Sequence, residues 1–439
     1  MNVCWKKNFP ILSPRALLAR PNQSSVSCAR SFFLLGVLCA LCANSFLDTS
    51  IAAAAPAPAP KWRVETADAR VLSGQLQSIS AEKIVVRTDK GPQELPIADV
   101  VEFSAGDQPD DIMDVPGQAV LQTAQGDALA VRAVSYDGKK LTASGGVAGR
   151  VETPADAARA ILLPPVSRTA AEMLKAYEKM QLAPATGDRL IVSRAGAQNL
   201  AVDGVLEGID ADKIIFRWKD ESRTIARASV PIIMLAAVAS KPAAAAFGTL
   251  IARDSSRLRF RSLTLEAGKL VIDTAAMGRI TMPLADAVIV RLSSSQVVRL
   301  SALKPVAENE HGFFETTFRH RVDKSVGGRP LRLGGRQYAT GLGLHSFCEL
   351  TYNLDANFTS FVAVVGIDDE ARPHGDATVT FQADGKPLGE GLHVTGQADP
   401  QPVRLDVRGV KQLMIRVGFG PDGLGVGDHV DLAGARLIK

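Results

Sequence analysis

Apolar and polar residues alternate along most of the chain after residue 60, with the period of two that is typical of β-strands. In residues 71–97 the apolar positions are Val71, Leu76, Ile79, Ile84, Val86, Leu95 and Ile97. Turn signals at Ala81-Glu82 and Asp89-Lys90-Gly91 separate these runs. Residues 168–181 instead show helical spacing, with Met173, Leu174, Tyr177 and Met180 on one face. The pattern therefore predicts a mainly β protein with one linking helix.

Residues 62–293 contain a repeated unit in four copies, near 62–104, 112–164, 187–238 and 245–293. The clearest match aligns Gly74–Ile79 with Gly204–Ile209, and Gly248 aligns with the first residue of a further copy. Three copies end in related segments that share an aspartate, which we interpret as a turn or capping carboxylate: Asp99, Asp156 and Asp286. Each copy predicts a small twisted sheet of three to five strands. Such sheets are marginally stable alone, so we expect neighbouring copies to pack together.

The pattern divides the chain into a leader, two pairs of repeats and a C-terminal domain. We expect a signal peptide at 1–55, an Ala/Pro linker at 56–61, repeat units 1 and 2 at 62–164, a helical linker at 165–186, and units 3 and 4 at 187–293. The C-terminal domain spans 300–439, with strands predicted at 349–354, 360–367, 377–383, 403–407, 412–417 and 430–437. Many short strands with a closing one favour an antiparallel β-sandwich of jelly-roll type.

The first 55 residues have the layout of a secretory signal peptide. A basic segment ends at Arg30, an apolar run follows from Ser31 to Ala43, and small residues come after it. This run is shorter than the roughly 20 residues that a membrane-spanning helix needs. We therefore expect export to the periplasm, cell envelope or exterior, without a membrane span after cleavage. An uncleaved anchor is the alternative.

Charge excludes one class of partner. The chain has 50 Lys and Arg against 46 Asp and Glu, but residues 1–60 hold five of the bases and one of the acids. The remainder is balanced, with 45 of each sign. Nucleic-acid binders need an excess of Lys and Arg to displace counterions from phosphates. We therefore expect no nucleic-acid partner.

Cysteine and histidine are unevenly distributed. Four of the five cysteines lie in the leader, so Cys348 has no partner for an internal disulfide and is interpreted as a buried apolar residue. All six histidines follow residue 300, and no H-x₃-H or HExxH spacing occurs among them. The spacing therefore predicts no zinc site.

Residues 300–438 resemble the NPCBM family, which was noted beside glycoside hydrolases of family 98 and is related to carbohydrate-binding module family 51. The motifs that carry the resemblance are Tyr338–Ser346 (YATGLGLHS), Val365–Glu370 (VGIDDE), Phe381–Lys386 (FQADGK) and Asp428–Ala435 (DHVDLAGA). The resemblance implies a galactose-binding-like sandwich that binds sugars at its loop end. The repeats resemble small barrel-like units of exported bacterial proteins, with an Sm-like or SH3-like sheet, and that resemblance implies no function.

The candidate carbohydrate ligands are carboxylates, imidazoles and a phenol on predicted loops and strand ends, where they hydrogen-bond sugar hydroxyls: Tyr338, His345, Asp368, Asp369, Glu370, Asp428 and His429. Oxygen-rich loops also suit calcium, so a calcium ion near Asp368 and Asp369 is the one cofactor considered. Sugars commonly stack on aromatic faces, yet all three Trp residues lie outside this domain. That leaves Tyr338, Tyr352 and Phe419 as aromatic candidates.

Three functions follow from these features. The first is an exported, non-catalytic protein that binds carbohydrate through its C-terminal domain. The alternative is a structural or interaction scaffold of the cell envelope, with protein partners. A glycoside hydrolase is the least favoured, because its two carboxyls must face each other at a defined separation. Asp368, Asp369 and Glu370 are adjacent, and neighbouring residues of an extended strand point in opposite directions.

Overall fold

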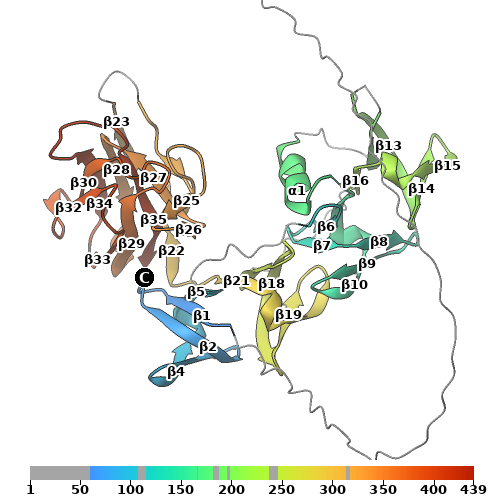
Figure 1. The fold of residues 1–439 in the computed structure, drawn as a ribbon, viewed down its shortest axis with the longest axis horizontal. Helices are drawn as coiled ribbons and strands as arrows, with labels where there is room; N and C mark the ends of the chain where they lie inside the picture. The colour runs from blue at the N-terminus through green and yellow to red at the C-terminus, as the bar shows by residue number, and fades with distance from the viewer. Residues whose placement is uncertain are drawn as a thin grey trace, which may run out of the picture. The chain divides into compact units, whose positions relative to one another are not determined.

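A computed structural model of the chain describes residues 60–106, 115–165, 167–180, 187–194, 198–236, 246–312 and 317–439. These residues are mainly β, with one α-helix among them, α1 (Ala170–Lys179), which confirms the predicted fold class (Figure 1). The predicted signal peptide and most of the predicted linker lie outside the described residues. No helix of the described ranges is long and apolar enough to cross a membrane.

The four repeat units share one plan, a run of antiparallel strands with a short 3₁₀ turn before the last strand. Unit 1 contains β1 (Trp62–Thr66), β2 (Val71–Ile79), β3 (Lys83–Thr88), β4 (Gly91–Pro96) and β5 (Val100–Ala105). Unit 2 contains β6 (Ala119–Thr123), β7 (Ala128–Val131), β8 (Ala133–Tyr136), β9 (Lys140–Gly146), β10 (Gly149–Pro154) and β11 (Ala158–Leu162). Unit 3 contains β12 (Asp188–Val192), β13 (Leu200–Ile209), β14 (Lys213–Trp218), β15 (Glu221–Ala226) and β16 (Ile232–Met234). Unit 4 contains β17 (Gly248–Ala252), β18 (Arg257–Glu266), β19 (Lys269–Thr274), β20 (Gly278–Pro283) and β21 (Ala287–Leu292).

The recurring aspartates lie in the 3₁₀ turns that precede the last strands, as a turn role requires: Asp99, Asp156 and Asp286. The alignment of Gly248 with Gly74 is wrong. Trp62 of β1 pairs with Gly74 of β2, whereas Gly248 of β17 pairs with Phe260 of β18. The glycine and the aromatic residue have therefore exchanged strands in unit 4. At either position a Cβ on the glycine would lie within 2.5 Å of a backbone carbonyl oxygen, which is why neither site accepts a side chain.

The repeats join through their last strands. β5 of unit 1 pairs with β21 of unit 4, and β11 of unit 2 pairs with β16 of unit 3, both antiparallel. The inward residues of all four units form one apolar cluster that includes Val64, Leu121, Leu190 and Leu250. Joining closing strands in this way pairs sheet edges that would otherwise offer free backbone groups to other chains.

Helix α1 is held by a capping box at its first turn. The Thr169 hydroxyl accepts from the Glu172 amide at 3.2 Å, and the Glu172 carboxylate accepts from the Thr169 amide at 3.0 Å. The buried face carries Ala170, Met173 and Tyr177, which pack on a second apolar cluster with Val120 and Leu162. The helix predicted at 168–181 is therefore present and packs against the strands of unit 2.

The C-terminal domain is an antiparallel sandwich of two sheets. The first sheet runs β24 (Arg321–Val322), β27 (Gly341–His345), β35 (His429–Ile438), β29 (Ser360–Ile367), β33 (Gln401–Asp406), and β22 (Val297–Arg299) also pairs with β35. The second runs β23 (Ala307–Glu310), β28 (Cys348–Asn353), β34 (Gln412–Phe419), β30 (Asp376–Ala383), β31 (Lys386–Pro387), and β32 (Leu392–Thr395) also pairs with β30. A separate hairpin joins β25 (Leu331–Leu333) to β26 (Arg336–Tyr338).

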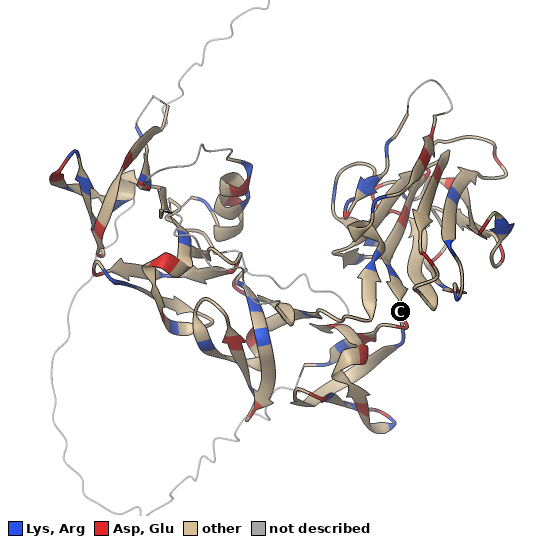
Figure 2. Ribbon diagram, turned by 180° about the vertical axis from the view of Figure 1, so that it is seen from behind, with Lys and Arg blue, Asp and Glu red and all other residues tan. Residues whose placement is uncertain are grey.

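The two sheets enclose one apolar core, with Leu344, Tyr352, Phe361, Phe381 and Val417 among its members. Strands of the second sheet bury alternate residues, so that sheet has one open face. β29 and β35 are buried on both faces, and Leu331 and Leu333 of the β25–β26 hairpin are buried as well. Figure 2 shows acidic and basic residues interspersed over the strands, as the balanced charge predicts.

Candidate functional site

The end of β27 and the start of β35 bring two histidines together. His345 and His429 are partners in the β27–β35 ladder, and their ring centroids lie 5.6 Å apart. Phe318, which is 42% exposed, stacks on His345 with the ring centroids 4.3 Å apart and an interplanar angle of 22°. It also lies 6.4 Å from the ring of His429. We call Phe318, His345 and His429 the ring cluster.

Glu370 holds one ring of this cluster in place. His429 Nδ1 donates to Glu370 Oε1 at 2.9 Å, and the Gly327 amide donates to the same oxygen at 2.9 Å. Burial opposes ionisation of Glu370, but the hydrogen bonds from His429, Ser325 and Gly327 outweigh it and lower the pKa of the carboxyl. Glu370 is therefore an anion at neutral pH that fixes the orientation of His429.

His345 is held from the opposite side. Its Nδ1 donates to the Ser346 carbonyl oxygen at 2.6 Å, and burial lowers the pKa of its imidazole, so the ring is neutral at neutral pH. Ser346 Oγ donates to Asp428 Oδ2 at 2.5 Å, and the Asp376 amide donates to the other oxygen of Asp428 at 2.8 Å. Burial raises the pKa of Asp428. Asp428 is thus a buried support for Ser346, the residue whose carbonyl holds His345, rather than a group open to a ligand.

The loop before β35 borders the ring cluster. A Cβ on Gly425 would lie 3.2 Å from Phe419 Cε1 and 3.5 Å from His345 Cε1, so the loop backbone passes directly beside both rings. Leu424 and Val426, on either side of that glycine, are exposed. The site therefore combines an exposed aromatic ring, two imidazoles and an apolar rim, a combination suited to a ring-shaped ligand with polar edges.

Asp368 and Asp369 do not reach the ring cluster. Asp368 is buried and accepts from the amides of Arg332 at 2.9 Å and Glu370 at 2.8 Å. Asp369 accepts from the amides of Gly334 at 2.9 Å and Gly335 at 2.7 Å. Both carboxylates therefore fasten the loop after β29 to the β25–β26 hairpin, which is a structural role.

Asp431 is a carboxylate that the sequence analysis did not select. It is fully buried in β35, and among the described residues neither carboxylate oxygen has a hydrogen-bond partner of normal geometry, although the Asp368 carboxyl and the Arg332 amide lie close to it. Burial, followed by the neighbouring Asp368, raises its pKa well above the usual range. An unpaired buried carboxyl is destabilising unless it is protonated or balanced by a cation. This orphaned group makes Asp431 a better calcium candidate than Asp369.

The neighbourhood of Asp431 is rich in oxygen. Gly343 and Gly366 are its partners on the two adjacent strands, and side chains of directly paired residues lie on the same face of a sheet. A Cβ on Gly343 would lie 2.3 Å from the Lys324 carbonyl oxygen, so the 323–329 loop covers this face. The donors are carboxylates and a backbone carbonyl, which are the hard oxygen ligands that calcium prefers. The carboxylates of Asp431 and Asp368 are thus the chemical type of ligand that calcium takes, with the Lys324 carbonyl on the same face of the sheet.

The three predicted aromatic candidates lie in different places. Tyr352 is 1% exposed and belongs to the core, because it alternates with the buried Cys348 and Leu350 of β28. Tyr338 lies under the Arg336 guanidinium, 4.6 Å from its ring centroid, and near Gly434 of β35. Five residues of strand separate Gly434 from His429, about 16 Å at the usual rise. Tyr338 is therefore outside the ring cluster.

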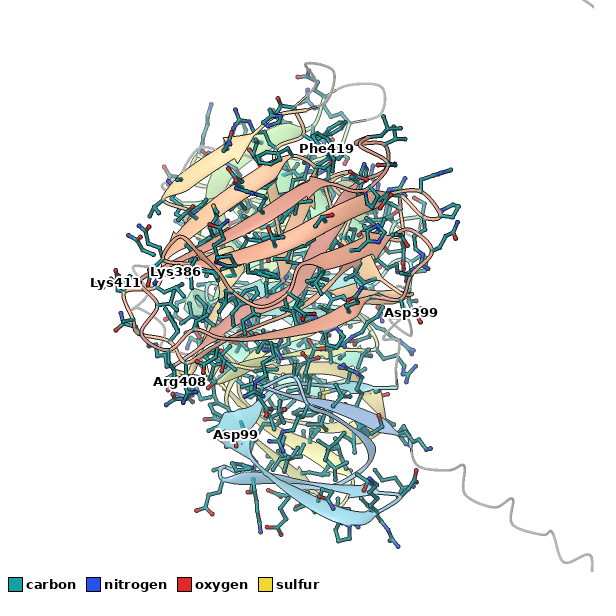
Figure 3. All side chains as sticks on the ribbon, turned by 90° about the vertical axis from the view of Figure 1, so that its left-hand side faces the viewer. Asp99, Lys386, Asp399, Arg408, Lys411 and Phe419 are labelled. Atoms are coloured by element: carbon teal, nitrogen blue, oxygen red, sulfur yellow. The ribbon has the colours of Figure 1, made fainter. Side chains whose placement is uncertain are left out.

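Phe419 is the aromatic candidate that lies near the cluster. Figure 3 places it away from Lys386, Lys411 and Arg408, which gather at the other end of the sandwich strands. Of the predicted residues, the structure thus brings His345, Glu370 and His429 together, with Asp428 supporting them. Phe318 and Asp431 were missed. A signal for Asp431 was an acid between two apolar residues of a predicted closing strand, whereas Phe318 has no periodic pattern around it.

Comparison with known proteins supports the assignment of the C-terminal domain. The family model of the NPCBM/NEW2 domain matches residues 296–438. A protein of Renibacterium salmoninarum named "Putative endo-alpha-N-acetylgalactosaminidase" is 33% identical over 92 residues. The aligned part covers 21% of this chain and 6% of that relative, so the chain spans a small fraction of the relative's length.

Two of the solved structures that match this chain contain CBM51 modules. A CBM51 module of a Clostridium perfringens GH95 protein, in complex with methyl-galactose, is 24% identical, with a TM-score of 0.29; the match covers 32% of this chain and 99% of that module. Tandem CBM51 modules of a family 98 glycoside hydrolase from Streptococcus pneumoniae are 14% identical, with a TM-score of 0.29; that match covers 86% of this chain and 87% of the tandem modules. These values assign no ligand to this chain. The family model of the NPCBM/NEW2 domain does match the whole C-terminal sandwich, residues 296–438.

Proposed function

We propose that the chain is an exported, non-catalytic protein that binds carbohydrate at the ring cluster of its NPCBM/NEW2 domain. The observation that carries the proposal is the exposed face of Phe318 beside two fixed imidazoles. An apolar sugar face stacks on an aromatic ring, while ring nitrogens and the Glu370 carboxylate are suited to the hydroxyl groups. The N-terminal leader is the support for export.

The distribution of carboxylates supports a binding role over hydrolysis. Hydrolysis needs two carboxyls on either side of the scissile bond, about 5–10 Å apart. Asp368 and Asp369 accept from backbone amides away from the cluster, and Asp428 is buried and hydrogen-bonded to Ser346. Of the predicted carboxylates, Glu370 alone borders the rings, and it is hydrogen-bonded to His429. One carboxylate of this kind binds a sugar but does not supply an acid–base pair.

Replacing Phe318 with alanine is expected to weaken carbohydrate binding about tenfold or more, because stacking on one ring contributes about 0.5–1.5 kcal/mol beyond its buried area. The measurement is a glycan array of the purified chain, followed by titration with the best ligand. Val306→Ala, which removes another exposed apolar side chain of the same domain, is the matched control and should bind normally. Unchanged binding in Phe318→Ala together with loss in Tyr338→Ala would place the site elsewhere.

We also propose that the domain binds calcium at Asp431, Asp368 and the Lys324 carbonyl. Calcium at a hundredfold excess over its dissociation constant should then stabilise the chain by about 2.7 kcal/mol. Asp431→Asn should lose this response. The same variant should raise stability without calcium at neutral pH, because a carboxyl with a raised pKa stabilises the folded state at low pH and this contribution is lost as pH rises.

The calcium measurement is thermal unfolding with and without calcium after chelator treatment. Asp399→Asn, an exposed carboxylate of the same domain, is the control and should respond as the wild type does. An equal calcium response in Asp431→Asn and the wild type would refute the proposed ligand set.

A further inference from the structure

The two histidines of the ring cluster form a pair that their spacing in the sequence does not reveal. His345 is the last residue of β27 and His429 is the first of β35, and the ladder places them directly opposite each other. Directly paired residues project from the same face of a sheet. The two rings are 5.6 Å apart between centroids and inclined by 59°. Two imidazoles are thus close together on one face.

Both rings are fixed in the same tautomer. A carbonyl oxygen and a carboxylate accept hydrogen bonds but donate none, so Nδ1 carries the proton in His345, which donates to Ser346, and in His429, which donates to Glu370. With Nδ1 of each ring engaged, Nε2 is the ring nitrogen that is left to face a ligand. Within the described residues neither Nε2 has a hydrogen-bond partner. Histidine ligands of metal ions are typically prepared in this way, with Nδ1–H bonded to a carbonyl or carboxylate.

The separation of the rings matches shared coordination. Zinc–nitrogen bonds of about 2.0–2.1 Å in a tetrahedral arrangement place two ring centroids roughly 5 Å apart. The observed 5.6 Å differs from this by an amount that small side-chain rotations absorb. We propose that His345 and His429 together bind a borderline divalent metal ion such as Zn²⁺ through their Nε2 atoms, with water in the remaining positions. This goes beyond carbohydrate binding, although it uses the same ring nitrogens that the proposed function assigns to sugar hydroxyls.

A second group of potential ligands lies elsewhere in the domain. Ligand atoms of Glu308, Glu310 and His320 all lie within 4.8 Å of one another. Glu310 already accepts from the His320 amide at 2.6 Å and from Arg319 at 3.2 Å, and His320 Nδ1 is 3.0 Å from the same carboxylate. Glu310 and His320 of that group are thus already engaged with each other. The His345–His429 pair offers two imidazoles, which suit zinc, whereas the other group offers one imidazole and two carboxylates. The experiment separates the two sites.

The test is calorimetric titration of the chelator-treated full chain with zinc chloride at neutral pH. We expect saturable binding of one ion. The substitutions His345→Ala and His429→Ala should each lower the affinity for that ion at least tenfold. His320→Ala and His393→Ala are controls that should bind as the wild type does. Glu370→Gln should lower affinity about tenfold, because a partner that orients a metal-ligating histidine typically contributes 10- to 100-fold. Binding that persists in His345→Ala and His429→Ala, or that is lost in His320→Ala, would overturn the proposal.

A measurement on the wild type avoids any effect of the substitutions on folding. Electron paramagnetic resonance of the chain with one equivalent of Cu²⁺ counts the nitrogen ligands through their hyperfine splitting. Two imidazole nitrogens are expected from this pair. A spectrum with one nitrogen, or with oxygen ligands alone, would contradict the assignment.

Discussion

Replacing Gly343 with alanine is expected to lower the free energy of unfolding of the C-terminal domain by about 1–3 kcal/mol, the usual cost of overpacking. The added Cβ would lie 2.3 Å from the Lys324 carbonyl oxygen and 2.7 Å from the backbone of Ser325. These are main-chain atoms, so no rotamer change relieves the clash and the 323–329 loop must move. The Gly327 amide of that loop holds Glu370, so carbohydrate binding should weaken as well.

Gly418→Ala is the matched control for this substitution. Gly418 also lies in a strand of the sandwich, and a Cβ there would meet the Thr378 carbonyl oxygen at 3.9 Å, an ordinary contact. Urea unfolding of the two variants and the wild type measures the difference. Equal stability of both variants would show that the loop does not press on Gly343.

Replacing Glu370 with glutamine is expected to lower stability by about 1.5–3 kcal/mol at pH 7, the usual contribution of hydrogen bonds to a charged group. The pKa of Glu370 is lowered in the folded chain, so its contribution is present above the unfolded value of about 4.3 and is lost as pH falls through the folded value. The gap between variant and wild type should therefore shrink on acidification. Glu370→Gln should also bind carbohydrate more weakly than the wild type, because His429 loses its anionic partner.

Urea unfolding between pH 3 and pH 7 measures this difference in the free energy of unfolding. Glu390→Gln, which neutralises an exposed glutamate of the same domain, should match the wild type throughout. A loss of stability in Glu370→Gln that is the same at every pH would mean that the packing of this side chain, and not its charge, stabilises the fold.

Six strands of the C-terminal domain could be predicted closely from the sequence, whereas β23–β27, β31 and β32 were not predicted. The run 360–367 matches β29 residue for residue, and the other five predicted strands agree with β28, β30, β33, β34 and β35 to within two residues at each end. Turn residues such as Asp384-Gly385 bound these strands, and their apolar residues alternate toward one core. Where pattern and burial agree in this way, the local sequence determines the element.

The site was less predictable, because it depends on which strands become neighbours. His345 and His429 were selected separately from a resemblance, but their pairing comes from the β27–β35 register, which no local pattern reveals. Asp368 and Asp369 follow an apolar strand, as a loop ligand would, yet backbone amides of the β25–β26 region take up their oxygens. A carboxylate on a loop is recognisable from sequence, whereas its hydrogen-bond donors are not.

The pairing of closing strands in the repeats has a consequence for the order in which the chain folds during synthesis. β11 and β16 are separated by about 70 residues and β5 and β21 by roughly 180, so the inner pair is complete first. At about 5–20 residues per second, β5 waits roughly 10–40 s for its partner. Throughout that interval one edge of β5 is unpaired and open to other chains. Units 2 and 3 are therefore expected to fold first, with units 1 and 4 closing last and most exposed to misassembly.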